Sequence, residues 1–569
     1  MATMEQSSEA RRRWAALLGG AAALWAMLAH RLAETPVAEW GSNGTAWAEH
    51  AGRLSWLVAL RQNATTDDPL GPLALLRAME SGFPAGLYLV GVALEPVVGA
   101  SAEAVAWTGL LWLPLLAWGV GAVAAALGAR RSLGAVAALG VLMVPALPAS
   151  ALRYYFDLPM TALVWASAGA IVCWPRPAGG LLAGLLAGAA CVVKWTALPF
   201  VLPIWLGLAL SRRDDGGARG TSLAALAVAT ATLGLVVGGY LAAVGGDNSL
   251  LAMADEARVG AQTGGVGGLF ASTLRGLFSL QPEPGARLLF YLGTTVAGVL
   301  SPLGAGLLLA ALVGWWRGGR AAWPLVAATV LGHAAVLFLL VRPADERFVL
   351  TGLPALVVVA SLGWQGWTPT ARRRFAVVAM AAMGAVAGDA HLGSTPLGRP
   401  AVELQVVPGG GPIASQTLRL RGLGMASSFQ GRGWYRRDEV PAARAALREA
   451  TWRWLLACGA PGVRVAIDAP TVHDEGDQQW FGYRSALADW RGEPGQFALS
   501  GFGCEEAVER AGAVWLQPST RAGNQQPPPC PADADWALID VVEDPDGGAG
   551  VAAWSAVGAG DCAALRGGD

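Results

Sequence analysis

Long apolar runs, separated by short polar segments, follow one another through the first 391 residues of the chain. A helix needs about 20 apolar residues to cross the hydrocarbon core of a bilayer, and most of the runs approach that length. If each run crosses once, the pattern predicts a mainly α-helical transmembrane bundle with about eleven spans. The runs are 14–29, 104–128, 133–150, 158–174, 178–193, 196–211, 221–244, 287–315, 323–341, 348–364 and 375–391.

The composition also indicates a polytopic membrane protein. Of the 569 residues, 54% are hydrophobic and 14% are charged, whereas a soluble domain usually carries about 25% charged residues. The net charge of −1 gives no indication of a nucleic-acid partner, and none is expected. The run 14–29 follows three arginines as a signal sequence does, but no clear small-residue cleavage site follows it. We therefore expect it to remain as the first span.

The arginines predict which side of the membrane each loop faces. If the eleven runs cross once each, the arginine-rich loops all fall on one side, which the positive-inside rule assigns to the cytoplasm together with the N-terminus. This requires the apolar piece 83–98 to stay within a long first outer loop, about 30–103, as an interfacial or re-entrant helix. The arginines concerned are Arg11–Arg13, Arg130–Arg131, Arg176, Arg212–Arg213, Arg317–Arg320 and Arg372–Arg374.

The opposite, outer face then collects the conspicuous polar segments. Besides the first loop, these are the turn 153–159, Lys194, the glycine-rich loop near 245–286, the segment 342–348 and the tail after about residue 392. The sequence thus predicts a transmembrane domain over 1–391 and an extracytoplasmic domain over 392–569, in a multi-pass protein of the cytoplasmic (inner) membrane.

The tail has the pattern of a soluble α/β domain. Alternating strand-like segments and a helical one predict strands near 463–468, 513–518 and 536–542 and a helix over 442–456. An outer location would permit two disulfides, in any of three pairings, among Cys458, Cys504, Cys530 and Cys562. The run His473, Asp474, Glu475 and Asp477 contains metal-ligand types, but without a recognisable ligand spacing a solvated loop is favoured.

Asp157 stands out because the chain re-enters the membrane there. A carboxylate at that depth is costly and marks a functional-site hypothesis. The alternative is structural, since Asp157 followed by Leu158 and Pro159 is also a good helix start, with Asp as the N-cap. One residue can serve in both ways.

Four segments resemble one family. They are RYYFDLPMTALVWAS (153–167), GLLAGLLAGAACVVKWTALPFVLP (180–203), ERFVLTGLPALVVVAS (346–361) and FPAGLYLVG (83–91). In order and topology they resemble the GT-C membrane glycosyltransferases. Within these they are most similar to the protein O-mannosyltransferase and lipid A aminoarabinose transferase group, which is like glycosyltransferase family 39. The resemblance implies a polytopic helical fold, in some members with a C-terminal outer-face α/β domain.

The resemblance also implies an inverting transfer of a sugar from a polyprenyl-phosphate donor to an acceptor at the outer face. Such a reaction needs a carboxylate to deprotonate or hold the acceptor hydroxyl and cations around the departing phosphate. The implied catalytic acids are Asp157, Glu39 and Glu49, and the implied donor phosphate-binding residues are Lys194, Arg153 and Arg347.

The chain departs from the family in the first outer loop. Where the family has an Asp shortly after its first span, the stretch 38–54 contains none, and Glu39 and Glu49 are the nearest acids. Either a glutamate substitutes, with Glu39 favoured because it lies closest to the first span, or the chemistry differs, or activity has been lost. Asp67 and Asp68 lie farther along the chain.

Each cation also has a structural alternative. Lys194 at a span end could snorkel to the headgroups, and Arg347 could form a salt bridge with Asp345 or Glu346. For Arg153, a headgroup contact beside Tyr154 and Tyr155 is slightly favoured.

The expected partners are a polyprenyl-phosphate sugar donor, membrane lipid, and a glycan, lipid or protein acceptor. The sequence has no phosphate-binding loop of the GxxxxGK[ST] kind, which suits a lipid-linked donor. No cofactor is assigned, and a divalent metal is left open. Two other functions stay open: a non-catalytic membrane scaffold that kept the fold, and a secondary transporter, although the spans carry few charges in their middles and show no repeat.

Overall fold

The computed structural model describes residues 53–59, 84–100, 108–128, 131–144, 146–151, 156–211, 223–244, 291–300, 302–318, 322–336 and 346–363, together with parts of 367–385 and of 402–555. The chain divides into two compact units, one formed by residues 1–34, 73–87 and 106–436 and the other by residues 35–72, 88–105 and 437–569. The predicted boundary between residues 391 and 392 lies outside the described residues and stays a prediction.

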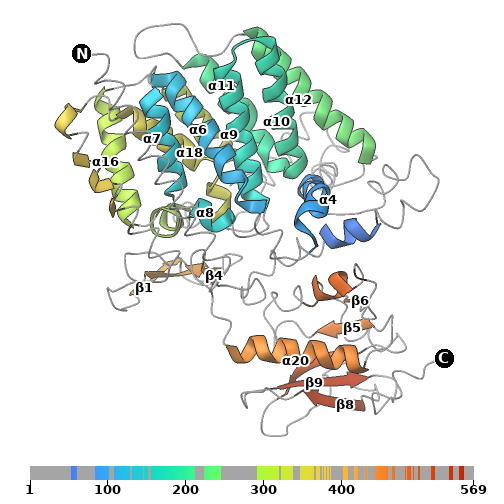
Figure 1. The fold of residues 1–569 in the computed structure, drawn as a ribbon. Helices are drawn as coiled ribbons and strands as arrows, with labels where there is room; N and C mark the ends of the chain where they lie inside the picture. Colours follow the sequence, from blue (N-terminus) through green and yellow to red (C-terminus); the bar gives the residue numbers. More distant parts are fainter. Residues whose placement is uncertain are drawn as a thin grey trace, which may run out of the picture. The chain divides into compact units, whose positions relative to one another are not determined.

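The first unit is a bundle of apolar helices (Figure 1). Along the chain they are α4 (Gly86–Val98, whose first two residues belong to this unit), α6 (Trp112–Gly128), α7 (Arg131–Leu142), α8 (Ala146–Ala151), α9 (Asp157–Cys173), α10 (Pro177–Val193), η2 (Trp195–Ala197), α11 (Leu198–Leu210), α12 (Leu223–Val244), the π-helical turn η3 (Thr294–Val299), α16 (Pro302–Gly318), α17 (Trp323–Ala334), η5 (Glu346–Val349) and α18 (Leu353–Gly363).

Helix α9 is the central element of this bundle. It packs against α6, α10 and α11, and Figure 1 shows it between α6 and α10. Every residue of α9 from Asp157 to Val172 is buried, as expected for a helix that is hydrophobic all round. A charged residue in this helix therefore lies inside protein, where it needs a partner.

Three glycines let α10 approach α12 closely. Gly180, Gly184 and Gly188 recur every four residues, so they form one stripe along α10. A Cβ on Gly184 would lie 2.5 Å from the carbonyl oxygen of Ala229 and 2.5 Å from Cβ of Thr232. Small residues at such an interface let backbones meet, which is how helices in membranes associate.

Gly184→Ala is expected to lower the stability of the bundle. The new methyl group has to displace backbone of α12, and overpacking of this kind costs about 1–3 kcal/mol. The matched control is Gly234→Ala in α12, where an added Cβ would meet nothing within 4 Å. We expect a lower thermal unfolding midpoint in detergent for the first variant only, and equal midpoints would contradict this account of the glycine stripe.

Three of the predicted spans differ from the observed helices, each near a proline. The run 133–150 divides into α7 and α8, with Pro145 between them in the sequence. The run 287–315 contains η3 before α16 begins at Pro302, and the run 348–364 starts as the 3₁₀ turn η5 before α18. Proline has no N–H to donate and disfavours helix at the residue before it, so apolar continuity alone overestimates these helices.

Helix length alone identifies few spans. Among the described residues, one helix, Leu223–Ala243 within α12, is both long and apolar enough to cross a membrane, and the other apolar helices have 10–17 residues. The polytopic character of the protein therefore rests on the fold as a whole. The span 14–29 and the predicted outer loop between about 245 and 286 lie outside the described residues.

The second unit contains a five-stranded mixed sheet. Its strand order is β6 (Ala498–Leu499), β5 (Arg464–Ile467), β7 (Val514–Ser519), β9 (Gly550–Ser555) and β8 (Ala537–Val542). β5 runs parallel to β6 and β7, whereas β9 is antiparallel to β7 and β8. Helix α20 (Ala442–Cys458) packs against β8 and β9.

The helix and three strands of this unit lie where the sequence predicts them. α20 covers the expected helix over 442–456, and β5, β7 and β8 cover the three expected strands. The short strands β6 and β9 were not predicted. Two ribbons that belong to the first unit, β1–β2 (Val402–Val407 and Gln416–Leu420) and β3–β4 (Ser428–Phe429 and Arg432–Gly433), were not predicted either. The predicted disulfide cysteines and the run from His473 to Asp477 lie outside the described side chains.

Candidate active site at the start of helix α9

Asp157 is the first residue of α9 rather than its N-cap. The N-cap position is Phe156, and no side chain caps the helix there. The carboxylate of Asp157 is 3% exposed, and its Oδ1 accepts a hydrogen bond of 2.7 Å from Nζ of Lys194. A negative charge in the first turn of a helix is favourable, but the partner that holds this carboxylate comes from another helix.

Lys194 comes from the break between α10 and α11. It ends α10 as the C-cap residue, with extended backbone, and η2 begins at the next residue. Its side chain is 7% exposed, so the ammonium is buried against Asp157 instead of snorkelling to a headgroup. Nζ also lies 4.9 Å from the centre of the Phe348 ring, a cation–π distance.

Arg347 enters the cluster from η5. Its Nε lies 4.0 Å from Oδ2 of Asp157, and its guanidinium carbon lies 5.3 Å from the centre of the Phe348 ring. At 20% side-chain exposure it is the most accessible member of the cluster. The alternative salt bridges involve Asp345 and the side chain of Glu346, which lie outside the described residues.

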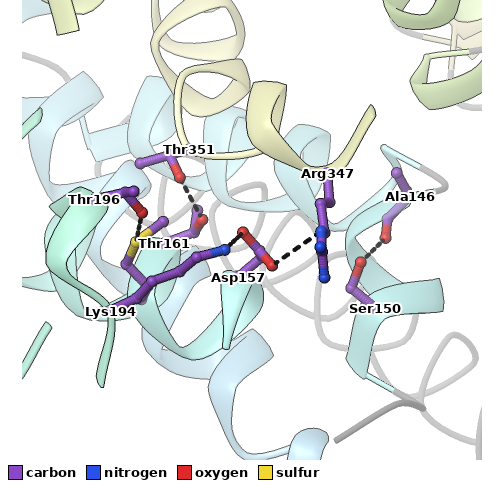
Figure 2. Close-up of polar contacts among 9 residues, drawn as sticks. Ala146, Ser150, Asp157, Thr161, Lys194, Thr196, Arg347 and Thr351 are labelled. Carbon is purple, nitrogen blue, oxygen red and sulfur yellow. Dashed lines mark hydrogen bonds and ion pairs between the residues drawn. The ribbon is translucent and has the colours of Figure 1, made fainter. Parts of the chain in front are cut away.

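The three side chains form a cluster with net positive charge in which Asp157 and Lys194 are buried and Arg347 is partly exposed (Figure 2). Two cations, Lys194 and Arg347, lie beside one carboxylate in a site with little solvent, where charges interact strongly. Oδ2 of Asp157 is buried and accepts no hydrogen bond from the described residues. The cluster therefore suits an anionic ligand, and it offers one carboxylate oxygen to a hydroxyl group.

The structure brings together three of the six predicted site residues. Asp157, Lys194 and Arg347 meet although they span 190 residues of sequence. Glu39, Glu49 and Arg153 lie outside the described residues, so their assignments stay predictions. No group of three His, Cys, Asp or Glu side chains that could hold a metal occurs among the residues that the structure describes.

The composition of the chain holds one further signal for this site. Lys194 is the single lysine of the chain, and the other 39 of the 40 basic residues are arginines. A compact ammonium differs from a guanidinium in size and in hydrogen-bond geometry. In a chain that uses arginine everywhere else, the one lysine draws attention to position 194.

The comparisons with known proteins address the fold. No protein-family model matches the sequence, and no curated protein sequence does. The crystal structure of ArnT from Cupriavidus metallidurans bound to undecaprenyl phosphate matches 97% of this chain and 99% of its own, with a TM-score of 0.55 and 12% sequence identity. The chain has the GT-C fold.

Two further structures are similar to parts of this GT-C fold. The apo state of the same ArnT, a lipid A aminoarabinose transferase, matches 91% of this chain and 94% of its own at 12% identity, with a TM-score of 0.47. The Archaeoglobus fulgidus oligosaccharyltransferase AglB, in complex with an inhibitory peptide and a dolichol-phosphate, matches 67% of this chain and 56% of its own at 13% identity, with a TM-score of 0.41.

The match to the ligand-bound ArnT confirms the fold that the four sequence motifs predicted. Three of those motifs contain the three members of the cluster: Asp157 in RYYFDLP, Lys194 after the glycine stripe, and Arg347 in ERFVLTG. In this GT-C fold these three motifs therefore meet at one site.

Proposed function

We propose that this protein transfers a sugar from a polyprenyl-phosphate donor to an acceptor hydroxyl at the outer face of the cytoplasmic membrane. The observation that carries the proposal is the cluster of Asp157, Lys194 and Arg347 within a GT-C fold. Its net positive charge fits the phosphate of a lipid-linked donor. The structure of the similar ArnT with undecaprenyl phosphate supports this choice of ligand.

In this reaction the acceptor oxygen attacks the anomeric carbon of the sugar, and the bond from that carbon to the phosphate oxygen breaks. The polyprenyl phosphate leaves with the bonding electrons, so charge grows on the phosphate as the bond lengthens. Arg347 and Lys194 stabilise this charge, and Arg153 adds to them. The attack comes from the face opposite the leaving phosphate and inverts the anomeric configuration.

A carboxylate takes the proton of the acceptor hydroxyl. Asp157 suits this role through Oδ2, because Lys194 occupies Oδ1 and Oδ2 accepts no hydrogen bond from the described residues. Catalytic hydrogen bonds are often long before the substrate binds and shorten in the complex. Glu39, with Glu49 as the second candidate, supplies the acid that the family places in its first loop.

The membrane arrangement is part of the same proposal. About eleven spans place the N-terminus in the cytoplasm and the cluster at the outer side, as the arginine distribution requires. The C-terminal residues 392–569 form an extracytoplasmic α/β domain. The acceptor is a glycan, a lipid or a protein, and the use of a divalent metal is left to experiment.

The proposal is tested by transfer assays in membranes that contain the protein. Radiolabelled polyprenyl-phosphate mannose and polyprenyl-phosphate aminoarabinose, the donors suggested by the two resembling groups, are supplied to wild type and to Glu39→Gln and Glu49→Gln. We expect label in a membrane glycan, lipid or protein with wild type, and loss with one glutamate variant. Binding of the lipid without transfer would favour a scaffold, and movement of the intact donor across the membrane would favour a transporter.

Arg347→Gln is expected to weaken the binding of undecaprenyl phosphate by about 10- to 150-fold, because a charge-assisted bond to phosphate is worth about 1.5–3 kcal/mol. The measurement is a titration of the purified protein in nanodiscs. Arg453→Gln is the control, because Arg453 is 77% exposed and belongs to the other unit. Unchanged affinity in Arg347→Gln would remove Arg347 from the phosphate site.

A further inference from the structure

The segment that carries Arg347 is attached to α9 by buried polar contacts. The hydroxyl groups of Thr351 and Thr161 are 3.0 Å apart and hydrogen-bonded (Figure 2). The indole Nε1 of Trp165 donates to the carbonyl oxygen of Thr351 at 2.8 Å. All three residues are fully or almost fully buried, so water cannot replace these bonds.

The contacts share a register with the candidate site. Asp157, Thr161 and Trp165 are spaced by four residues, so they lie on one face of α9. Arg347 and Thr351 are also four residues apart, and they meet Asp157 and Thr161 respectively. A tight turn joins them, since the backbone N–H of Leu350 donates to the carbonyl of Arg347. Movement of Thr351 along α9 would therefore move Arg347 relative to Asp157.

A second helix, α17, also contacts this turn. A ring nitrogen of His333 donates to the carbonyl oxygen of Val349 at 3.2 Å. The ring also packs edge-on against Phe200 and covers Gly352, where a Cβ would lie 1.6 Å from the imidazole Cε1. The turn after Arg347 is thus fixed by polar contacts from two helices.

We propose that Thr351 is a positioning residue for Arg347 in the proposed transfer reaction. Through its hydroxyl bond to Thr161 and its carbonyl bond to Trp165, it fixes the register in which Arg347 faces Asp157. Nε of Arg347 and Oδ2 of Asp157 are 4.0 Å apart, at the outer limit of an ion pair, so a shift of Arg347 away from Asp157 would take the two groups out of contact. This inference rests on the proposed function for its meaning, but its geometry can be tested without activity.

The first measurement is the coupling between Asp157 and Arg347. The unfolding equilibrium constant in mixed micelles is measured for wild type, Asp157→Asn, Arg347→Gln and the double variant. This double-mutant cycle gives the coupling, the factor by which the effect of one substitution changes when the other is present. In the protein with Thr351 in place, we expect a coupling of about fivefold or more. With Thr351→Val, which keeps the shape and removes the hydroxyl, the coupling should fall to within about twofold of none.

Two controls separate positioning from general packing. Thr351→Ser keeps the hydroxyl and should preserve the coupling. Thr451→Val removes a buried hydroxyl of the same kind in the other unit, where it donates to the carbonyl of Leu447, and should leave the coupling unchanged. An undiminished coupling in Thr351→Val would overturn the proposal, as would an equal loss in Thr451→Val.

The second measurement is the binding of the proposed lipid ligand. Thr351→Val should weaken undecaprenyl phosphate binding about fivefold, and should have no further effect when Arg347→Gln is already present. Equal effects with and without Arg347→Gln would assign Thr351 a structural role only. If wild type neither binds the lipid nor transfers sugar, the proposed function fails, while the coupling measurement still decides the role of Thr351.

Discussion

Lys194→Met is expected to destabilise the folded protein by about 3–5 kcal/mol, because it leaves the buried carboxylate of Asp157 without its closest partner. The double variant Asp157→Asn, Lys194→Met should recover most of this loss, because it removes both charges of the most buried pair and leaves beside the new amide only Arg347, whose side chain is 20% exposed. The measurement is the unfolding equilibrium of the three proteins in mixed micelles. The recovered double variant should still be unable to transfer sugar.

The control for this prediction lies on the same helix. Arg176 is exposed at the N-cap of α10, at the end of the helix opposite Lys194, so Arg176→Met should change stability by less than about 0.5 kcal/mol. Lys194→Arg keeps the charge but places a larger planar group in a site with 7% exposure. If Lys194→Arg kept the full stability and transfer rate of wild type, the size of the side chain would not explain why a lysine stands at this position.

The position of Asp157 could be predicted from sequence, whereas its partners could not be predicted from the residue pattern alone. An acid between two apolar runs is visible in any hydropathy pattern. Its bond to Lys194 depends on how α9 and α10 pack, and its approach to Arg347 depends on a turn 190 residues away. The hydrophobic periodicity indicates neither contact, so Lys194 and Arg347 could be predicted only from the motif resemblance. The presence of a single lysine in the chain was a further indication of the site.

The limits of the fold prediction have a similar origin. Apolar length identified the helices around α9 but ran through Pro145 and Pro302, where the chain changes geometry. The span predicted over 348–364 begins inside the 3₁₀ turn η5, Glu346–Val349, and this turn carries Arg347 to Asp157. Thr351 was invisible for the same reason, since a threonine in an apolar run shows its function only through the side chains that it meets.

Asp157→Asn is expected to lower the rate of sugar transfer by about 10²–10⁴-fold, the range for loss of a positioned general base. The amide keeps the size of the side chain but cannot take the acceptor proton. It also leaves Lys194 facing a neutral amide, so the hydrogen bond that orients the ammonium is weaker. The measurement is the initial rate with radiolabelled polyprenyl-phosphate sugar, taken well below the unfolding midpoint of the variant.

Two comparisons give this result its meaning. Glu449→Gln makes the same carboxylate-to-amide change at a partly exposed ion pair with Arg484 in the other unit, and should keep the wild-type rate. Undecaprenyl phosphate should bind to Asp157→Asn at least as well as to wild type, because removing the carboxylate increases the net positive charge around the phosphate. A rate unchanged in Asp157→Asn would leave proton removal to a first-loop glutamate and reduce Asp157 to a residue that orients Lys194 and Arg347. If Asp157→Asn bound the lipid more weakly but kept the wild-type rate, the carboxylate would contribute to lipid binding and have no role in the transfer step.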